Sequence, residues 1–332
     1  MLQTVEIRPE EAKAEYTRLL EEERQEYFDA DGRLRPTFAV PTDCPVCGHG
    51  ERQPYDPAVQ PAYQECRQCG CVYTDPRLSA EAMHQLVRTS PALNYFHEHI
   101  LLATEPVRRE RIFRPRLERL RRHVPRGRVL ELGCAVGTFL GLLQEVGYEA
   151  EGVELCGFSI EHNRRLGRRI HDRPIEQLDL PPATFDAVCA WEVLCHVRSP
   201  RDTVAAVFKA LRPGGVLMLT TINVLSFEYL TLRARHHTMI PHVFYQYFTP
   251  GGIRRLLETA GMADIVVETP GQTDVQNIRD VLGRPDPSLG RFLNHLLFDD
   301  SAGAESRRTA FQEFIAAHGR SGHMLVTARR PL

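Results

Sequence analysis

The residues best suited to chemistry lie in a strand, a turn and a helix start near the middle of the chain. An apolar run at residues 129–132 contains Glu131, and Gly133 and Gly137 lie four positions apart in the turn that follows it. A second apolar run ends in Glu154, 23 positions after Glu131. Glycines let a ligand approach the backbone closely, and an acid after the second strand can accept hydrogen bonds from both hydroxyls of a ribose. The pattern predicts a site for a ligand with an adenosine and a cationic or polar tail.

Two ligand classes compete for this turn. A dinucleotide needs the spacing G-x-G-x-x-G, which lets a pyrophosphate bind at the helix N-terminus. This chain instead reads E-x-G-x-A-x-G from Glu131 to Gly137, with Ala135 at the central small position. A carboxylate beside the turn would repel a pyrophosphate but would suit the ammonium group of an amino acid. The spacing therefore favours S-adenosylmethionine over NAD, and an ordinary strand–turn–helix without a ligand is the remaining alternative.

The same stretch resembles the first motif of the class I S-adenosylmethionine-dependent methyltransferases, E/D-x-G-x-G-x-G, with Ala135 in place of the central glycine. Four further stretches resemble this family: Thr184–Val188, Trp191–Val197, Leu211–Gly215 and Tyr247–Pro250. The resemblance implies an α/β fold, a Rossmann-like seven-stranded methyltransferase sheet with helices on both faces. It also implies S-adenosylmethionine as cofactor and methyl transfer as the activity.

The cofactor-binding residues that this resemblance implies are Glu131, Gly133, Cys134, Gly137, Glu154, Leu155, Ile175 and Trp191. Glu154 would hold the ribose and Leu155 would lie against the adenine. Pro174 stands where the family has an acid for the adenine amino group, so the Ile175 backbone or the Glu176 carboxylate would replace it. Trp191 follows the fourth strand at the edge where such sheets bind ligands, and it either packs on the cofactor or fills the core.

Four cysteines form two knuckles, C-x2-C, eighteen residues, C-x2-C, and they are Cys44, Cys47, Cys66 and Cys69. A glycine follows each knuckle and permits the positive φ of a tight turn. Four thiolates close a tetrahedral zinc site and leave no position for water, so we expect one structural Zn²⁺. A disulfide pair or a redox C-x-x-C is the alternative. The stretch Cys69–Pro76 resembles the zinc ribbon that precedes some natural-product and sugar methyltransferases.

The elements that position these residues alternate between strand and helix from Arg128 onward. The expected strands are 128–132, 149–153, 168–171, 185–190 and 214–221, and the expected helices are 137–146, 157–167 and 201–211. A last strand at 322–328 should pair antiparallel with 264–268. The predicted domain organisation is an amphipathic N-terminal helix in 1–40, a zinc ribbon at 41–78, a helical cap at 79–125, and the methyltransferase domain at 126–332 with a helical insertion at about 271–320.

Three residues are candidates for removing a proton from the methyl acceptor: His196, His242 and Tyr245. His196 should lie near the carboxyl edge of the sheet, and its imidazole titrates near neutrality. Sugar C-methyltransferases with the zinc ribbon carry His-Glu-His where this chain has His242-Val243-Phe244, which argues against C-methylation by that mechanism. The interpretation is O-methylation of a natural product or sugar-like metabolite. N- or C-methylation of such a metabolite, or a zinc-ribbon RNA methyltransferase, is the alternative.

Composition restricts the partners. A net charge of −2 and a pI near 6.7 do not call for nucleic acid, and we interpret the arginine run at 108–122 as the solvated face of a helix. No run approaches the ~20 apolar residues of a membrane span, and the N-terminus lacks a secretion signal. Nine cysteines, several of them in predicted core elements, fit a reducing cytoplasm. The expected partner is a small-molecule acceptor, and a homodimer is possible.

Overall fold

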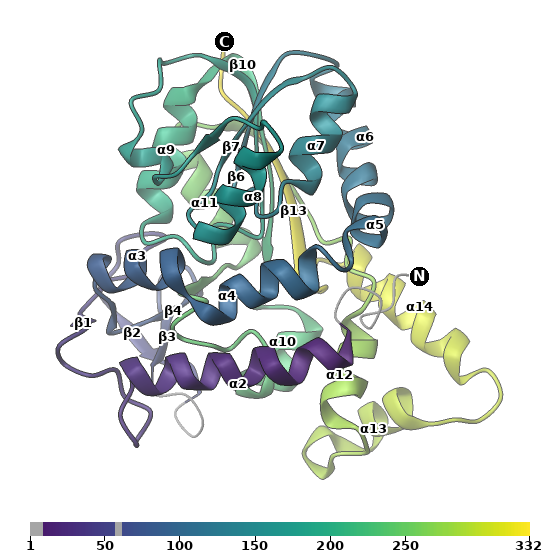
Figure 1. The fold of residues 1–332 in the computed structure, drawn as a ribbon. Coiled ribbons are helices and arrows are strands. Elements are labelled where there is room, and N and C mark those ends of the chain that lie inside the picture. Colours follow the sequence, from purple (N-terminus) through teal and green to yellow (C-terminus); the bar gives the residue numbers. More distant parts are fainter. Residues whose placement is uncertain (1–8, 57–61) are drawn as a thin grey trace.

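A seven-stranded mixed sheet forms the centre of the structure, a computed structural model that describes residues 9–56 and 62–332 (Figure 1). Its strand order is β12-β13-β10-β9-β6-β7-β8. The strands are β6 (Arg128–Leu132), β7 (Glu149–Val153), β8 (Ile170–His171), β9 (Phe185–Trp191), β10 (Leu211–Ile222), β12 (Ala263–Glu268) and β13 (His323–Arg329). Only β13 runs antiparallel to its neighbours in this sheet, β10 and β12. The predicted α/β sheet and the antiparallel pairing of its last strand are confirmed.

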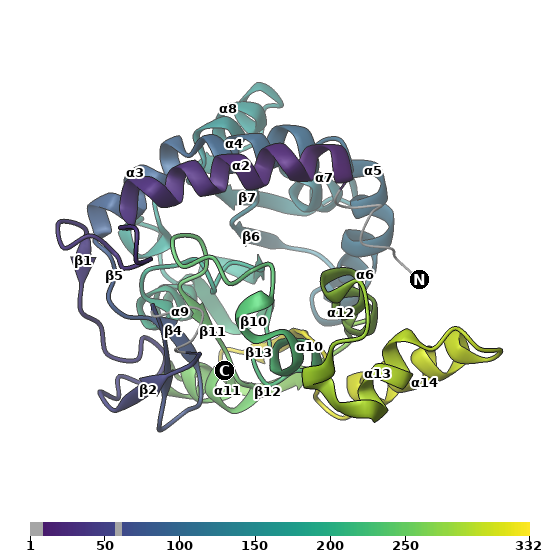
Figure 2. The same cartoon turned by 90° about the horizontal axis from the view of Figure 1, so that it is seen from below.

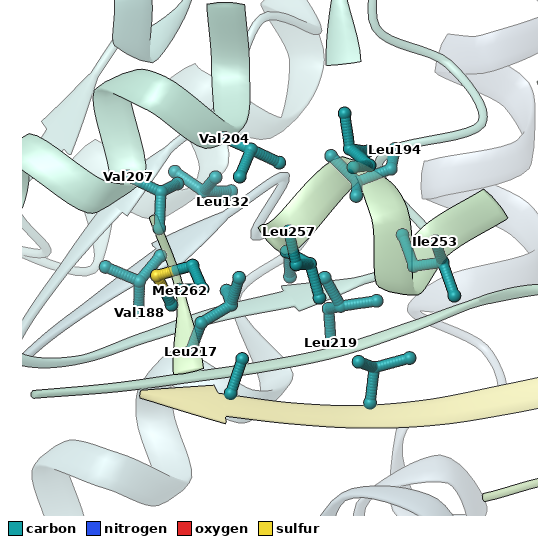
Figure 3. Close-up of a cluster of buried hydrophobic side chains, with 14 of the residues drawn as sticks. Leu132, Val188, Leu194, Val204, Val207, Leu217, Leu219, Ile253, Leu257 and Met262 are labelled. Atoms are coloured by element: carbon teal, nitrogen blue, oxygen red, sulfur yellow. The ribbon is translucent and has the colours of Figure 1, made fainter. Parts of the chain in front are cut away.

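Strand alternation separates the core into two layers. Along β6, Leu130 and Leu132 belong to one buried cluster, whereas Val129 belongs to the other. Successive side chains of a strand point to opposite faces of a sheet, so Glu131 projects into the same layer as Val129. The helices α9 (Pro200–Ala210) and α11 (Pro250–Thr259) cover the first layer, which Figure 3 shows in close-up. The helices α6 (Arg114–His123) and α7 (Thr138–Glu145) cover the second layer.

The cysteine segment contributes three strands to a small separate sheet, and the fourth strand of that sheet comes from a distant part of the chain. Its strands are β2 (Arg52–Pro54), β3 (Tyr63–Cys66), β4 (Val72–Thr74) and the distant β11 (Gln246–Tyr247), and a second pair joins β1 (Ala39–Val40) to β5 (Arg77–Leu78). Cys44 and Tyr73 belong to the same buried cluster as Leu132 of the main sheet. The cysteine segment therefore shares its core with the large sheet.

Helices from the first third of the chain cross the edge where the parallel strands end (Figures 1 and 2). They are α2 (Glu10–Tyr27), α3 (Ala80–Thr89) and α4 (Pro91–Tyr95), followed by the π-helical η1 (Phe96–Leu101), α5 (Glu105–Arg108) and the π-helical η2 (Arg109–Phe113). Glu23 joins α2 to α4, because its carboxylate accepts hydrogen bonds from the Ser90 hydroxyl (2.5 Å) and the Ala92 amide (2.9 Å). Parts of the predicted segments 1–40 and 41–78, including the start of the chain, lie outside the described residues.

The remaining helices lie after the strands or between β12 and β13. They are α8 (Gly157–Arg165), α10 (Phe227–Leu232), α12 (Asp274–Leu282), α13 (Gly290–Phe298) and α14 (Ala304–Ala317), with short 3-10 turns η3 (Ile175–Gln177), η4 (Arg233–Arg235) and η5 (Pro287–Leu289). Within the insertion, the sequence predicts helices at 289–298 and 305–317, which are observed as α13 and α14, whereas α10 and α12 were not predicted. No helix in the described part of the chain has the length and apolarity needed to cross a membrane.

Candidate active site

The turn after β6 adopts the left-handed backbone that its small residues permit. Its φ angles are +60° at Gly133, +47° at Ala135 and +79° at Gly137. A Cβ at Gly133 would lie 2.7 Å from a methyl group of Val193, and a Cβ at Gly137 would lie 2.0 Å from the side-chain oxygen of Asn163. Both glycines are therefore required by conformation and by close packing. The turn brings its backbone to the carboxyl edge of the sheet, as the sequence predicted.

Glu131 carries a buried carboxylate with an oxygen that has no hydrogen-bond partner. The residue is 2% exposed, and Oε2 is the unpaired atom. Burial raises the pKa of Glu131 well above its ordinary value, although the cations of Arg168 and Arg116 oppose that rise. An unpaired buried acceptor is costly, and a ligand ammonium group would satisfy it. The chemistry of this position fits the amino group of S-adenosylmethionine.

Arg116 lies beside this carboxylate, turned inward from a helix whose other arginines are largely solvated. Its guanidinium lies 4.7 Å from the ring centre of Trp191 and 5.4 Å from that of Phe113. Burial lowers the pKa of Arg116 to about 10, while Glu192 and Glu131 favour its charged form. The side chain is thus a cation at neutral pH. The expectation of a solvated face does not hold for Arg116, because helical spacing places it toward the sheet with the buried Leu117 and Leu120.

Trp191 ends β9 and packs between this cation and α7. Its ring meets Phe139 edge-on, with the ring centres 5.1 Å apart and the planes at 86°. Trp191 is 8% exposed and belongs to the buried cluster under α6 and α7. Its indole Nε1 has no hydrogen-bond partner among the described residues. The residue therefore fills the core and also offers a buried, unpaired donor near Glu131.

The Glu154 side chain stabilises the turn after β6 by hydrogen bonds to the backbone. Its carboxylate accepts hydrogen bonds from the backbone amides of Ala135 (2.7 Å), Leu155 (2.6 Å) and Cys156 (2.8 Å). Burial raises the pKa of Glu154, and these three amides oppose the rise. A carboxylate has about four acceptor positions, so one remains for a ribose hydroxyl. The prediction that it accepts from both hydroxyls stays a prediction, because the structure shows most of its acceptors in use.

Three other predicted cofactor residues lie at the same edge with different degrees of burial. Ile175 is 5% exposed and packs in the layer under α9, while Cys134 is 5% exposed and packs in the opposite layer. Leu155 follows β7 and is half-buried. The side chains of Ile175 and Cys134 thus pack in the hydrophobic core. Only their backbone atoms are free to contact a ligand.

The hydrogen bond of the His196 ring to a backbone carbonyl fixes the role of its ring nitrogens. Its Nδ1 lies 2.7 Å from the Val243 carbonyl oxygen, an acceptor, so Nδ1 carries the proton and Nε2 keeps its lone pair. Burial lowers the pKa of His196, although the Val243 carbonyl and the Glu192 carboxylate oppose this. The ring is therefore neutral at neutral pH. That is the state in which Nε2 can accept a proton.

His242 and Tyr245 lie deeper than the sequence analysis anticipated. Each is 1% exposed. Burial lowers the pKa of His242 to about 4, and neither of its ring nitrogens has a hydrogen-bond partner. The Tyr245 hydroxyl donates to the His242 carbonyl at 2.8 Å, and its ring packs with Tyr27 and Leu78. The structure does not bring these two side chains into one polar cluster with His196.

Glu192 and His323 were missed by the sequence analysis. Glu192 directly follows Trp191 with a left-handed φ of +57°, and its carboxylate lies 3.2 Å from Nδ1 of His323, the first residue of β13. Non-glycine residues with such φ angles concentrate at functional sites. The surrounding protein opposes a charge on His323, but the Glu192 carboxylate raises the pKa of His323 to about 9. His323 is therefore a cation at neutral pH, and its side chain is 55% exposed.

The four cysteines of the two knuckles converge on one point. Their sulfur atoms lie within 4.8 Å of one another, with 3.6 Å between those of Cys44 and Cys69 and 3.5 Å between those of Cys47 and Cys66. Tetrahedral Zn–S bonds of ~2.3 Å imply sulfur separations of ~3.8 Å. All four are free of disulfides, and Cys71, which is not one of the four converging residues, lies 3.9 Å from the Thr249 hydroxyl. The arrangement fits a closed four-thiolate zinc site.

Comparison with known proteins finds a family match in the middle of the chain. Residues 107–267 match the family model described as "Methyltransferase domain". The chain is similar to the ubiquinone biosynthesis O-methyltransferase of Idiomarina loihiensis, 33% identical over 153 residues, which is 42% of this chain and 63% of that protein. It is also similar to the enzyme of the same name from Methylococcus capsulatus, 30% identical over 154 residues, 41% of this chain and 62% of that protein.

A solved structure supports the fold of the chain. Phosphoethanolamine N-methyltransferase 2 of Haemonchus contortus, solved with S-adenosyl-L-methionine, superposes with a TM-score of 0.50. The match covers 79% of this chain and 63% of that one at 17% identity, so it speaks to the Rossmann-like methyltransferase fold alone. The chain spans less than two thirds of the length of these two curated relatives. The cysteine segment, α2 and the insertion lie outside the family match.

Proposed function

We propose that this protein is an S-adenosylmethionine-dependent methyltransferase that O-methylates a small-molecule acceptor. The observation that carries the proposal is the unpaired Oε2 of Glu131, buried at the end of β6 beside a cation and an indole. The match to a methyltransferase domain and the names of the relatives support methyl transfer to oxygen. Transfer to nitrogen or carbon of such a metabolite is the alternative outcome of an acceptor screen.

The residues at the carboxyl edge suit the parts of this cofactor. Glu131 would hold the ammonium group through its unpaired buried oxygen, and the half-buried Arg116 cation would hold the carboxylate of the methionine end. Glu154 would bind the ribose through its remaining acceptor position. When bound, the cofactor supplies an electrophilic methyl group on a sulfonium. The protein must then align the acceptor and remove its proton.

His196 is the proposed general base. The hydrogen bond from Nδ1 to the Val243 carbonyl holds the ring with Nε2 unprotonated, and the lowered pKa keeps it so at neutral pH. Nε2 would take the proton of the acceptor hydroxyl as the methyl group arrives. His242 and Tyr245, which the sequence suggested for the same role, lie in the core beneath α2, so the proposal rests on His196.

We also propose that one zinc ion at the four cysteines holds the acceptor-side loop in place. The support is structural: β11 pairs with β4, and the Thr249 hydroxyl donates a hydrogen bond to the Cys69 carbonyl at 2.9 Å. The segment after the fifth parallel strand is thereby joined to the second cysteine knuckle. The zinc would act on stability and on loop position, since four sulfurs leave no open coordination position.

Calorimetric titration with S-adenosylmethionine tests the proposed function. The chain should bind the cofactor, and an acceptor screen with labelled methyl groups should show turnover on an oxygen. Absence of binding in the folded, zinc-containing chain would overturn the proposal. Binding together with turnover only on nitrogen or carbon would retain the methyltransferase and replace the proposed O-methylation.

A further inference from the structure

A second group of metal-ligating side chains lies outside the cysteine site. Glu228 of α10 and the consecutive His236 and His237 bring one oxygen and two nitrogens within 4.8 Å of one another. Glu228 and His236 have side chains that are 4% and 3% exposed, and their Oε1 and Nε2 atoms are 2.7 Å apart. The ring of His237 is exposed and stacks on that of His236 with centres 4.4 Å apart. Two ligands are thus buried and the third faces solvent.

We propose that Glu228, His236 and His237 bind a divalent transition-metal ion of the zinc class and leave an open coordination position on the exposed side. Two imidazoles and one carboxylate form the three-ligand set that proteins use for catalytic zinc and for open iron(II) sites. The cysteine site has four soft sulfur ligands and is closed. The chain would therefore hold two metals of different lability.

The groups around these ligands orient them as a metal site requires. The Asn277 side-chain amide donates to Glu228 Oε1 at 3.1 Å. Nδ1 of His236 accepts a hydrogen bond from the Thr238 backbone amide at 3.2 Å and lies 2.9 Å from the Thr238 hydroxyl, and the Tyr229 ring stacks on the His236 ring with centres 3.9 Å apart. In this arrangement Nε2 carries the proton and points at Glu228, and the Thr238 hydroxyl is placed to accept a proton from Nδ1 once a metal occupies Nε2. The direction of the ring is fixed by these contacts before any ion arrives.

The distances need only a small adjustment. Zinc bonds of ~2.0–2.2 Å to nitrogen and oxygen place neighbouring ligand atoms roughly 3.0–3.5 Å apart. The Glu228–His236 separation of 2.7 Å would open slightly, and the exposed His237 ring would move inward. Without an ion, the Nε2 proton bridges the two buried groups; an ion would take its place at Nε2, and the ring proton would move to Nδ1, where the Thr238 hydroxyl can accept its hydrogen bond. A hydrogen-bonded pair without metal affinity is the competing explanation, and His237 distinguishes the two.

The site adjoins the proposed acceptor side, and this part of the inference rests on the proposed function. A Cβ on Gly322 would lie 3.0 Å from Glu228 Oε2. Gly322 directly precedes His323, whose imidazole pairs with Glu192 at the end of β9. An ion in the open site would bind an oxygen of the acceptor and favour its deprotonated form. The acceptor class that this geometry suits carries two neighbouring oxygen atoms, one for the metal and one for methylation.

Metal titration of the full-length chain tests the inference. After dialysis against a chelator, one zinc should stay in the thiolate site, and one Co²⁺ or Zn²⁺ should rebind reversibly at the second. Cobalt bound there should lack the sulfur charge-transfer absorption of a thiolate site. The His237→Ala variant changes an exposed side chain and should weaken rebinding at least about 10-fold. His295→Ala, at a side chain that is 69% exposed on α13, is the matched control and should rebind as wild type does.

Two results would overturn the second site. One is a chelator-treated chain that rebinds no ion, and the other is a His237→Ala variant with unchanged affinity. Titration with S-adenosylmethionine, run on the same samples, keeps this test separate from the proposed function. A chain that binds the cofactor but no second ion loses only the metal site, whereas a chain that binds the ion but no cofactor loses the proposed function.

Discussion

The imidazole of His323 and the carboxylate of Glu192 lie 3.2 Å apart, although they are 131 positions apart in the chain. Glu192 directly follows the strand that Trp191 ends, and His323 begins the last strand, which pairs with β10 so that His323 lies opposite Ile222. The pair therefore marks the sheet edge at which the methionine end of the cofactor and the acceptor would meet.

Stability should depend on this pair at alkaline pH. The pKa of His323 is raised from 6.5 to about 9, so the charged pair stabilises the fold fully below pH 6.5 and that contribution is lost as the pH rises through 9. Urea unfolding from pH 7 to 9.5 should show a steeper loss for wild type than for His323→Gln. Glu192→Gln should likewise reduce the loss of stability between pH 7 and 9.5. Parallel profiles for wild type and both variants would contradict the assignment.

Cofactor binding should fail when the turn after β6 is blocked. In Gly133→Arg, the new side chain meets Val193 and the backbone must hold a φ of +60°, so we expect no calorimetric signal with S-adenosylmethionine. Glu131→Gln keeps the size of the side chain and removes its charge, and it should weaken binding by about 1.5–3 kcal/mol. Gly251→Ala, where nothing lies within 4 Å of the added Cβ, is the control. Unchanged affinity in Gly133→Arg would refute the cofactor placement.

Turnover should depend on His196. A His196→Gln variant can still donate a hydrogen bond to the Val243 carbonyl but has no basic nitrogen, so we expect kcat to fall about 100-fold or more while cofactor affinity stays constant. Because the pKa of His196 is lowered by burial, wild-type kcat should remain flat from pH 8 to below pH 6.5 and decline only in acid. If the variant kept the wild-type kcat, a group other than His196 would remove the proton of the acceptor.

The local parts of this site could be predicted from the sequence, because they depend on neighbouring residues. The apolar run before Gly133 and the small residues up to Gly137 determine a strand, a left-handed turn and a helix start. The zinc knuckles are equally local. The inward turn of Arg116 and the pairing of Glu192 with His323 depend on tertiary packing, which no spacing in the chain reveals.

A topological signal for the missed pair did exist. The sequence analysis placed the last strand at 322–328 and paired it antiparallel with 264–268, so His323 had to lie at one end of the sheet. The sequence alone does not say at which end of the sheet His323 lies. The pairing of this strand with β10, seen in the structure, decides it. Helix α12 was not predicted because five of its nine residues are polar or charged and the exposed Val281 interrupts the pattern of an amphipathic helix. Its Asn277 consequently entered no prediction, although it orients Glu228.

The cysteine site should hold a zinc ion that resists chelation. Natively purified protein should contain one zinc that survives dialysis, and Cys44→Ser should lose it, because three thiolates no longer close the tetrahedron. Since β4 of this segment pairs with β11, the same variant should loosen the loop around Gln246 and unfold at a lower temperature. Cys71→Ser, at a sulfur outside the four-sulfur group, should keep the zinc. If natively purified protein contained no zinc, the predicted zinc ribbon would be wrong.

His242 should act on stability and not on turnover. It is 1% exposed with both ring nitrogens unpaired, so His242→Phe removes two unsatisfied polar atoms and should leave stability unchanged or raise it by about 1 kcal/mol. Burial lowers the pKa of His242 from 6.5 to about 4. Because the unfolded chain takes up this proton first, the wild-type fold should lose on the order of 3 kcal/mol as the pH falls from 7 to 4. Acid unfolding followed by circular dichroism should show a smaller loss in His242→Phe, with His242→Gln as a polar control. A collapse of kcat in the phenylalanine variant, with stability intact, would instead restore His242 to the reaction.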